Sequence, residues 1–543
     1  MAVTAIPKVR AEFSRPVLVL MGLVAVVFLI ACANLATLLF VRGAHRAGEM
    51  AVRTALGAGR AQLIRQWLTE AFLLAAVGGA GGLLVAGWID HLLLYFVAEA
   101  NRDFLRFHST NSVLTFTFGL TVMAAMLFGL PPALRATRVN AEAALRVHAQ
   151  SVLGRRGGAG RLTLAAQMAA SLVLVVGAML FARTLWNLNK TSGGFDRQQV
   201  VYALPRFSAV QLPPDRAVAA VRDVMERLRN SRDFISVSMG PPPIYSGPLG
   251  RASVVVPGYV YGPSEDNTAV GYPVAPQYFR TLAIPLVAGR EFEEHDGVVP
   301  PHAVIVNEKL AAHYFAGRNP LGQTLSLSDG PPMDIIGVVK NVKGSSLREP
   351  PRDMFYRPIP ADTYFTLVAR MTPYADASQG EAEIRQAFAS VTGKIIRVET
   401  GRLKEAVRDS LRRDRMVAEL SVAFGLLGLL LASIGLYGAI AHSVSGRTRE
   451  IGIRMALGAD RGAVMRMVFR QGLAISALGI VAGVPLAMIG AKLIESLLFG
   501  VSPVDPLVLA GSAALLASLA LLAGLWPARG AARLDPTQAL RHE

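Results

Sequence analysis

The chain has 543 residues, 52% of them hydrophobic, and a mean hydropathy of +0.41. These values exclude an ordinary soluble enzyme and a single compact domain, and they indicate an integral membrane protein. The net charge of +17 is uneven, because residues 187–412 hold 26 Lys or Arg and 23 Asp or Glu, so most of the excess lies in the apolar ends. Since those arginines occupy short loops between apolar runs, the positive-inside rule explains them and no nucleic-acid partner is expected.

Seven apolar runs are long enough to cross a bilayer, and they cover residues 17–41, 67–97, 113–134, 162–186, 417–441, 473–498 and 507–526. A short N-terminal segment, 1–16, precedes the first run, and a Gly- and Arg-rich connector, 147–161, follows the third. The Arg-rich loops are expected in the cytoplasm, which places residues 187–412 and the N-terminus outside and the C-terminus inside.

The first apolar run has a competing interpretation as a signal peptide. Basic residues precede it, and Leu29-Ile30-Ala31-Cys32 is similar to the cleavage motif of bacterial lipoproteins. The apolar run continues well past Cys32, however, and is longer than the core of a signal peptide. A spanning helix is therefore favoured. As the only cysteine of the chain, Cys32 has no partner for a disulfide or a cysteine metal site.

Residues 187–412 are polar, rich in Pro and Gly, and long enough for a core of their own. Short runs with β-type composition predict strands at 200–204, 236–239, 252–256, 303–306, 335–339 and 365–369. Helical spacing predicts helices at 215–228 and 380–391. The fold class is thus an α-helical membrane protein with about seven spans and one α+β domain. The only dense acid and histidine cluster, Glu293-Glu294-His295-Asp296, is interpreted as a polar loop, with a metal site as the alternative.

A basic stretch occurs twice, at residues 46–60 and 447–461, with a constant offset of 401. In each copy a glutamate precedes an arginine by four positions, as in Glu450 and Arg454, which favours an ion pair on a helix surface. The glycine that follows Ala-Leu suits the end of that helix. A second shared signature, Pro-Ala followed by Ala-Leu-Arg, ends each half, so 17–146 and 413–543 are two related three-span units.

The stretch Arg-Thr-Arg-Glu-Ile-Gly-Ile-Arg-Met-Ala-Leu-Gly-Ala, which begins at Arg447, resembles the signature of the MacB/FtsX-type permeases of ABC transporters. Val306-Asn307-Glu308 and Asn319-Pro320-Leu321-Gly322 are similar to the extracytoplasmic domain of that family. The order of segments is most similar to the duplicated orphan permeases called ADOP. Compared with that pattern, the first half lacks a leading span and outer domain, which predicts a start inside a longer gene or a fragment.

The resemblance implies a multi-pass permease of the bacterial inner membrane. A separate cytoplasmic ABC ATPase would dock on two coupling helices, and its motion would reach the outer domain to export or extract a substrate. The coupling residues would be Glu49, Arg53, Leu56, Gly57, Glu450, Arg454, Leu457 and Gly458. Other implied partners are membrane lipid, a second permease chain, and a periplasmic adaptor or outer-membrane protein.

No catalytic, cofactor or metal residues are expected, and ATP would act only through the partner subunit. The phosphate-loop pattern G-x-x-x-x-G-K-[ST] does not occur in the sequence, so the chain is not expected to hydrolyse ATP itself. Two alternatives to export stay open: an FtsX-like regulator that moves no substrate, and an inactive fragment. The repeated stretch has its own alternative, a membrane-surface helix whose arginines only fix topology.

Overall fold

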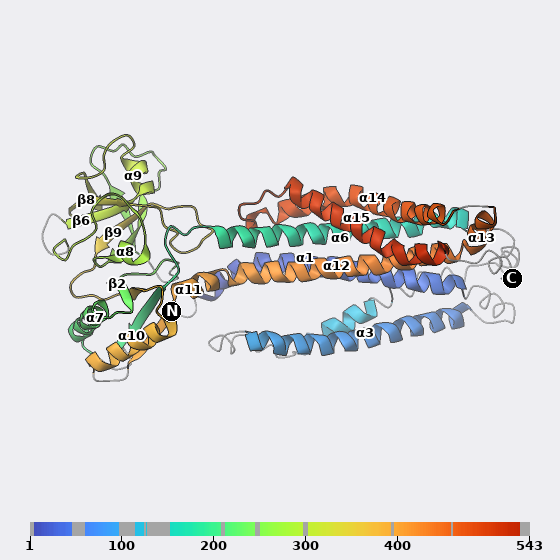
Figure 1. Cartoon of the computed structure of the whole chain (residues 1–543), viewed down its shortest axis with the longest axis horizontal. Coiled ribbons are helices and arrows are strands. Elements are labelled where there is room, and N and C mark those ends of the chain that lie inside the picture. Colours follow the sequence, from blue (N-terminus) through green and yellow to red (C-terminus); the bar gives the residue numbers. More distant parts are fainter. Residues whose placement is uncertain are drawn as a thin grey trace. The chain divides into compact units, whose positions relative to one another are not determined.

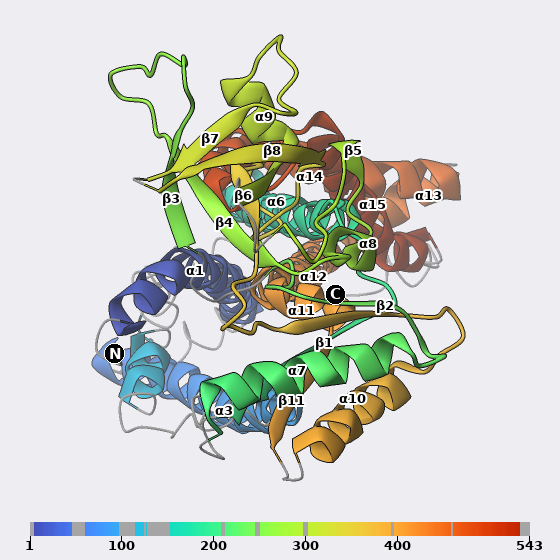
Figure 2. The same ribbon diagram turned by 90° about the vertical axis from the view of Figure 1, so that its left-hand side faces the viewer.

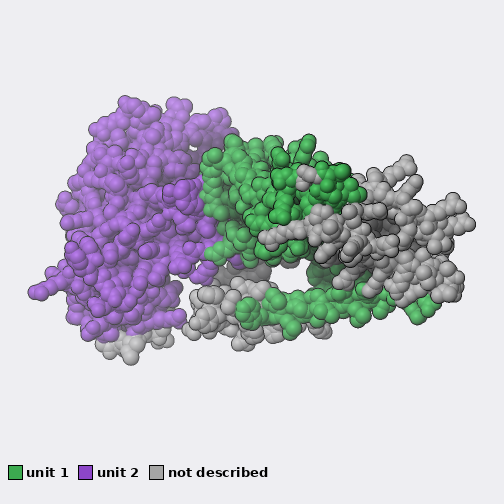
Figure 3. Space-filling view, turned by 45° about the vertical axis from the view of Figure 1, so that its right-hand side comes forward, with its two compact units in different colours: residues 1–184, 417–543 green, residues 185–416 purple. Residues whose placement is uncertain are grey.

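The computed structural model describes residues 5–45, 60–96, 115–123, 126, 153–207, 212–244, 250–296, 302–328, 330–392, 396–457 and 460–532. The chain divides into two compact units, coloured separately in Figure 3. One unit comprises residues 1–184 with 417–543, and the other comprises residues 185–416. The first unit is a helical bundle, and the second is an α+β domain.

The bundle contains the helices α1 (Ala5–His45), α3 (Arg60–Phe96), α6 (Leu153–Lys190), α12 (Arg412–Ser445), α13 (Thr448–Ala456), α14 (Arg461–Leu493) and α15 (Pro506–Ala532), with a 3-10 turn at Glu495–Leu497. All except α13 are long and apolar enough to cross a membrane. They correspond to six of the seven predicted spans. The remaining predicted span, 113–134, lies partly outside the described residues. Within it, residues 115–123 are described and are helical.

Three helices extend beyond the apolar runs that were predicted as spans. Helix α6 begins at Leu153, inside the predicted connector 147–161, and α1 begins at Ala5, inside the predicted N-terminal segment. Helix α14 begins at Arg461 rather than 473, so its first turns hold arginines that the prediction placed in a loop. The reason is visible in the packing, because Val464 and Val468 are buried at a spacing of four and continue the inward face of the helix.

Helix α6 is the central helix of the bundle, with 78% of its most apolar window buried. Glycines of α12 let that helix approach α6 closely: a methyl group added at Gly425 would lie 3.0 Å from Cβ of Ala178, and one added at Gly428 would lie 2.7 Å from a methyl of Leu174. Figure 1 shows α6 and α12 running along each other. The hydrophobic effect is weak between helices in lipid, so small residues at such contacts stabilise the pair by allowing close van der Waals packing.

Helix α14 packs on another side of α6 in the same way. A methyl group added at Gly479 would lie 2.5 Å from Cβ of Met168, and one added at Gly483 would lie 2.9 Å from Cα of Ala169. Both glycines are buried and four residues apart, so they share one face of α14. The two helices therefore meet backbone to backbone at these positions.

Polar side chains join α1, α6 and α12 in the middle of the bundle. The Nε2 of Gln167 donates to Oδ1 of Asn34 and to the carbonyl oxygen of Leu431, both at 3.1 Å, and Nδ2 of Asn34 donates to the same carbonyl at 2.8 Å. The Oγ of Ser171 donates to the carbonyl oxygen of Gly428 at 3.2 Å. Buried amides need such partners, and these hydrogen bonds fix the depth at which the three helices align.

Helix α15 begins where Asp505 caps it, since Oδ1 of Asp505 accepts hydrogen bonds from the backbone N–H groups of Leu507 (3.0 Å) and Val508 (3.3 Å). The other carboxylate oxygen lies 2.6 Å from Nη1 of Arg183 on α6. One carboxylate thus starts a helix and ties it to the central helix.

A four-stranded antiparallel sheet forms half of the α+β domain, in the order β11 (Arg397–Arg402), β1 (Val200–Arg206), β10 (Leu367–Met371) and β2 (Phe234–Met239). Helices α7 (Pro214–Arg229) and α10 (Ala377–Thr392) pack against each other and cover one face, as Figure 2 shows. Their buried residues, such as Val221 and Phe388, join the strands in one apolar core.

The second sheet has seven strands in the order β5 (Leu286–Gly289), β8 (Pro332–Val339), β6 (His302–Asn307), β9 (Met354–Pro358), β4 (Thr268–Val274), β3 (Gly250–Val255) and β7 (Thr324–Leu327). Strand β7 also pairs with β8, which closes six of these strands into a ring. Three short helices complete the domain: α8 (Tyr278–Leu282), α9 (Glu308–Tyr314) and α11 (Leu403–Ser410). All six predicted strands and both predicted helices are confirmed, whereas β4, β5, β7, β9, β11 and the short helices were not predicted.

Asn307, which belongs to the family motif Val306-Asn307-Glu308, has a structural role. Its Oδ1 accepts the backbone N–H of Leu310 and so caps α9, and it also accepts the N–H of Met354 at the start of β9, each at 3.0 Å. Its Nδ2 donates to Oδ1 of Asn341 at 2.8 Å. The motif therefore holds β6, α9, β9 and the loop after β8 together.

The first turn of α12, up to Met416, belongs to the same unit as the α+β domain. Nη2 and Nε of Arg348 lie 2.7 and 3.1 Å from the same oxygen of Asp414. Both side chains are largely buried, at 21% and 12% exposure, so this ion pair is screened less than a surface pair. The loop that contains Arg348 is therefore fixed to the start of the helix.

Candidate functional site

Helix α13 is the second copy of the repeated stretch and connects α12 to α14. Glu450 lies in its first turn and Arg454 in its last, the arrangement that the helix dipole favours. Nη2 of Arg454 lies 2.6 Å from Oε1 of Glu450, so the predicted pair with a spacing of four is present. The two side chains are 54% and 48% exposed, and a pair this exposed adds little to stability.

One face of α13 is anchored to the bundle. Ile451 is 1% exposed and packs with Val464 of α14 and Ala531 of α15. Met455, one turn later, lies partly buried against the same cluster. Apolar contacts of this face therefore hold the helix in place.

The opposite face of α13 is largely exposed, and one contact joins it to another helix, from Nη1 of Arg454 to Sδ of Met467 at 3.4 Å. It is formed by Glu450, Ile453, Arg454 and Leu457, which recur at spacings of three and four, and we call it the free face. Ile453 is 42% exposed and Leu457 is 84% exposed. Large apolar side chains flanked by charges on a short exposed helix are typical of a surface that another protein or a membrane covers.

The other predicted coupling residues cannot be placed in the same way. Glu49, Arg53, Leu56 and Gly57 of the first copy, and Gly458 of the second, lie outside the described residues. The structure thus gives the geometry of one predicted coupling helix, with Glu450, Arg454 and Leu457 on its free face.

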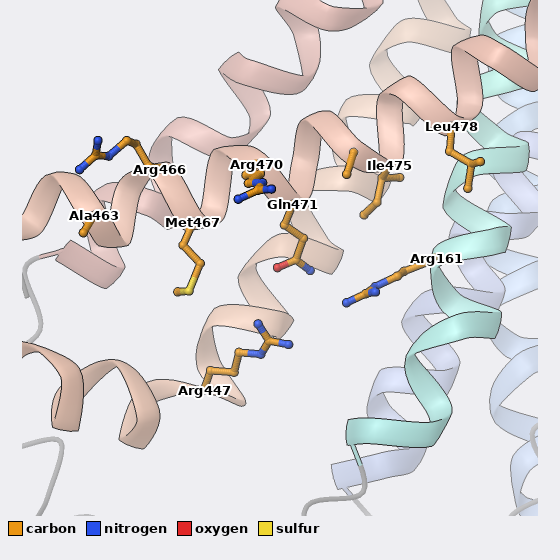
Figure 4. Close-up of a pocket in the computed structure, with 10 residues that line it drawn as sticks. Arg161, Arg447, Ala463, Arg466, Met467, Arg470, Gln471, Ile475 and Leu478 are labelled. Carbon is orange, nitrogen blue, oxygen red and sulfur yellow. The ribbon is translucent and has the colours of Figure 1, made fainter.

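A cavity of about 760 Å³ adjoins α13, and sequence reasoning missed it. Four arginines from three segments line it: Arg161 of α6, Arg447 just before α13, and Arg466 and Arg470 of α14. Figure 4 shows Arg161 of α6 and Arg447 of the turn before α13 extending into the same space. The spacing of four between Arg466 and Arg470 was the one signal in the sequence, since it puts both on one face once α14 begins at Arg461.

Two family models match most of this chain. The FtsX-like permease C-terminal model matches residues 21–141 and 422–536, and the second stretch contains α13. The MacB-like periplasmic core domain model matches residues 168–387. The chain belongs to the MacB/FtsX-type family of ABC transporter permeases. The repeat in the sequence therefore coincides with two FtsX-like stretches, and the α+β unit with the MacB-like domain.

The similar proteins carry names of the same kind. The uncharacterized ABC transporter permease YknZ of Bacillus subtilis strain 168 is 25% identical over 49% of this chain and 68% of its own length. The macrolide export ATP-binding/permease protein MacB of Sodalis glossinidius strain morsitans is 29% identical over 50% of this chain, and the match spans 43% of that protein. Among solved structures, the periplasmic region of MacB from Actinobacillus actinomycetemcomitans is 17% identical, covers 42% of this chain and 98% of its own, and gives a TM-score of 0.29.

The acid and histidine cluster of the MacB-like domain is organised by an arginine. Nη1 and Nη2 of Arg290 lie 2.6 and 2.7 Å from the two oxygens of Asp296, and these hydrogen bonds hold the pKa of that carboxyl below its usual range. The backbone N–H of Glu293 also donates to Asp296. The exposed His295 lies 3.5 Å from Glu293. Within the described residues, no group of three or more such side chains could hold a metal ion.

A second charged cluster of the MacB-like domain centres on His313 of α9. Its Nδ1 lies 2.6 Å from Asp353, and its Nε2 lies 2.8 Å from Glu265, which also accepts a hydrogen bond from Tyr259 at 2.9 Å. The ring stacks on Tyr314 with centroids 4.2 Å apart. Partial burial alone lowers the pKa of His313, but the bonds and charges of Asp353 and Glu265 outweigh it, so the pKa is raised.

We expect the stability of the MacB-like domain to fall as the pH rises through the folded pKa of His313. A raised pKa means that the folded state binds the proton more tightly, so the stabilisation is complete below the ordinary value of about 6.5 and is lost above the raised one. The variant His313→Gln should lower stability by about 1–2 kcal/mol at low pH and remove this dependence. Thermal unfolding of the full chain at several pH values measures both, and an unchanged pH profile in the variant would refute it.

Proposed function

We propose that this chain is the permease subunit of an ABC-type transporter and passes the motion of a separate cytoplasmic ATPase through the membrane to its MacB-like domain. Family membership supports the permease role, and the free face of α13 supports the ATPase contact. That face lies in the second FtsX-like stretch and exposes Ile453 and Leu457 beside the Glu450–Arg454 pair. It is the single observation on which the proposed ATPase contact rests.

The anchoring of α13 fits a transmitting element. Because Ile451 packs on α14 and α15, a force on the free face would be delivered to those helices rather than absorbed by a loose loop. At the other end of α12, the Arg348–Asp414 ion pair fixes the domain loop to the first turn of that helix. Rigid contacts at both ends of the route are what transmission of motion requires.

Export or extraction of a substrate is the second part of the proposal. MacB of Sodalis glossinidius is named for macrolide export, and half of the present chain aligns with that protein. The substrate of this chain would be handled at its extracytoplasmic domain, with no chemistry on the substrate. A regulator without a substrate would use the same coupling helix, so a transport assay in vesicles with the cognate ATPase separates the two.

Reversing the charge of Arg454 is expected to weaken co-purification with the ATPase subunit about tenfold, because like charges would meet at the interface. The variant is Arg454→Glu in the full chain, co-expressed with the ATPase. Its control is Arg412→Glu, which breaks an equally exposed pair, Arg412–Asp409 at 2.7 Å, in the other unit. Equal recovery of the ATPase with Arg454→Glu and wild type would reduce α13 to a topology signal.

In the proposed topology, α13 and the MacB-like domain face opposite sides of the membrane. In Tyr374→Cys the new thiol replaces a side chain that is 98% exposed in the domain, and in Leu457→Cys one that is 84% exposed on α13. The native Cys32 is buried and gives a low background. A membrane-impermeant maleimide should label Tyr374→Cys in intact spheroplasts and Leu457→Cys only after lysis. The reverse pattern would invert the proposed orientation.

A further inference from the structure

The cavity next to α13 is lined by positive charge that has no counter-charge among the described residues. No carboxylate lines it among the residues described, and none of its four arginines, Arg161, Arg447, Arg466 and Arg470, forms an ion pair within that part of the chain. Other arginines of the same bundle are paired, as Arg183 is with Asp505 and Arg454 with Glu450. Guanidinium groups that line one cavity repel one another, so an anion bound among them would be stabilised.

The lining of the cavity changes from charged to apolar along α14. After Arg466 and Arg470, the lining continues through Ala474, Ile475 and Leu478. These residues lie on one face of the helix, and the apolar part extends about 12 Å beyond Arg470 at 1.5 Å per residue. A ligand that fits the whole cavity therefore has an anionic end and a long apolar end.

The position of the cavity matches the boundary between water and lipid. Arg161 stands where the apolar part of α6 begins, and Arg470 stands where the charged first turns of α14 give way to its apolar part. Arginines at the ends of spans extend toward the headgroup layer, and basic pockets between spans bind the phosphates of anionic lipids. The planar guanidinium group also suits phosphate oxygens, which it binds through two parallel hydrogen bonds.

We propose that this cavity binds an anionic phospholipid, with its phosphate held by Arg161, Arg447 and Arg470 and an acyl chain along the exposed Ala474 and Leu478. The acyl wall favours a lipid over an acidic segment of a protein, which would need polar surroundings along its whole length. This inference goes beyond the proposed function. It rests on that function only in assigning the lipid to the cytoplasmic leaflet. Since Arg447 directly precedes α13, a bound headgroup would also hold the start of that helix.

The test uses the purified full chain in detergent, stripped of lipid and titrated with fluorescent phosphatidylglycerol. We expect phosphatidylglycerol to bind at least about tenfold more tightly than phosphatidylcholine with the same chains. The double variant Arg447→Gln/Arg470→Gln should lose about tenfold or more in affinity. The control is Arg461→Gln, which removes one of the arginines of α14 at an exposed position outside the cavity and should change affinity less than about twofold.

A second variant tests the apolar wall without touching the arginines. Leu478 is 51% exposed, so Leu478→Asn should leave the bundle intact and weaken lipid binding severalfold. Displacement of the lipid by excess inorganic phosphate would overturn the proposal in favour of a soluble phosphate site. Equal loss in Arg461→Gln, or full affinity in both cavity variants, would overturn it as well. Because no ATPase is present, failure of this test is distinct from failure of the proposed function.

Discussion

The variant Leu457→Asp is expected to lose about 100-fold or more in affinity for the cytoplasmic ATPase while keeping the stability of the wild-type permease. Leu457 is 84% exposed, so its side chain adds little to the stability of the folded permease. At an interface the same side chain would be desolvated, and a buried unpaired carboxylate would cost several kcal/mol. Affinity is measured between the detergent-solubilised permease and the purified ATPase.

Two further variants make this result interpretable. Val260→Asp introduces the same charge at a side chain that is 90% exposed in the MacB-like domain, and it should bind the ATPase as the wild type does. Ile451→Asp puts the charge on the anchored face, where the side chain is 1% exposed, so it should lower thermal stability as well as affinity. Wild-type affinity in Leu457→Asp would show that the ATPase docks elsewhere.

The second large effect is expected at the contact between α6 and α14, for the double variant Gly479→Ala/Gly483→Ala. The added methyl at Gly483 would lie 2.9 Å from Cα and 3.1 Å from the carbonyl oxygen of Ala169, and the one at Gly479 would lie 2.9 Å from the carbonyl oxygen of Ala165. These are main-chain atoms, which cannot rotate away, so the helices must separate. Overpacking of this kind costs about 1–3 kcal/mol per site.

The measurement is thermal unfolding in detergent, together with the fraction of protein that stays monodisperse. Gly490→Ala is the matched control, because it lies on the same helix and its added methyl would meet only a methyl of Val173 at 3.9 Å. That change should be neutral or slightly stabilising, since alanine favours helices by up to about 1 kcal/mol over glycine. Equal stability of the double variant and the control would mean that α6 and α14 do not meet as described.

The spans were predictable because length and apolarity decide whether a helix crosses a bilayer, whereas some strands were not. Strand β4 was missed because Gly271 and Pro273 resemble turn signals. The tertiary structure explains why both residues are tolerated in the strand. The ring of Phe355 fills the space beside Gly271. Pro273 lies beyond the last residue that pairs with β3, so its missing N–H breaks no hydrogen bond on that edge. Neither Phe355 nor the end of the pairing can be inferred from the local sequence.

The candidate site shows the same limit. Sequence spacing predicted the Glu450–Arg454 pair, because both partners lie on one helix. It could not separate Ile451, which is buried, from Ile453 and Leu457, which are exposed, since the anchor depends on Val464 and Ala531 from two other helices. The arginine cavity was missed for the same reason, because positive residues in separate loops also satisfy the positive-inside rule.

The central place of α6 has a consequence for how the protein is made. On the ribosome, α6 emerges before the whole α+β domain, and α12 and α14 follow only after it. At about 5–20 residues per second, the delay is on the order of 10–50 s. When α6 has been synthesised, its partner Asn34 on α1 is already present and can bond to Gln167. The face of α6 that packs on Gly479 and Gly483 stays uncovered until α14 has been synthesised. A membrane protease that removes unpacked helices has this interval in which to act, so slow export of the domain should reduce the yield of the whole chain.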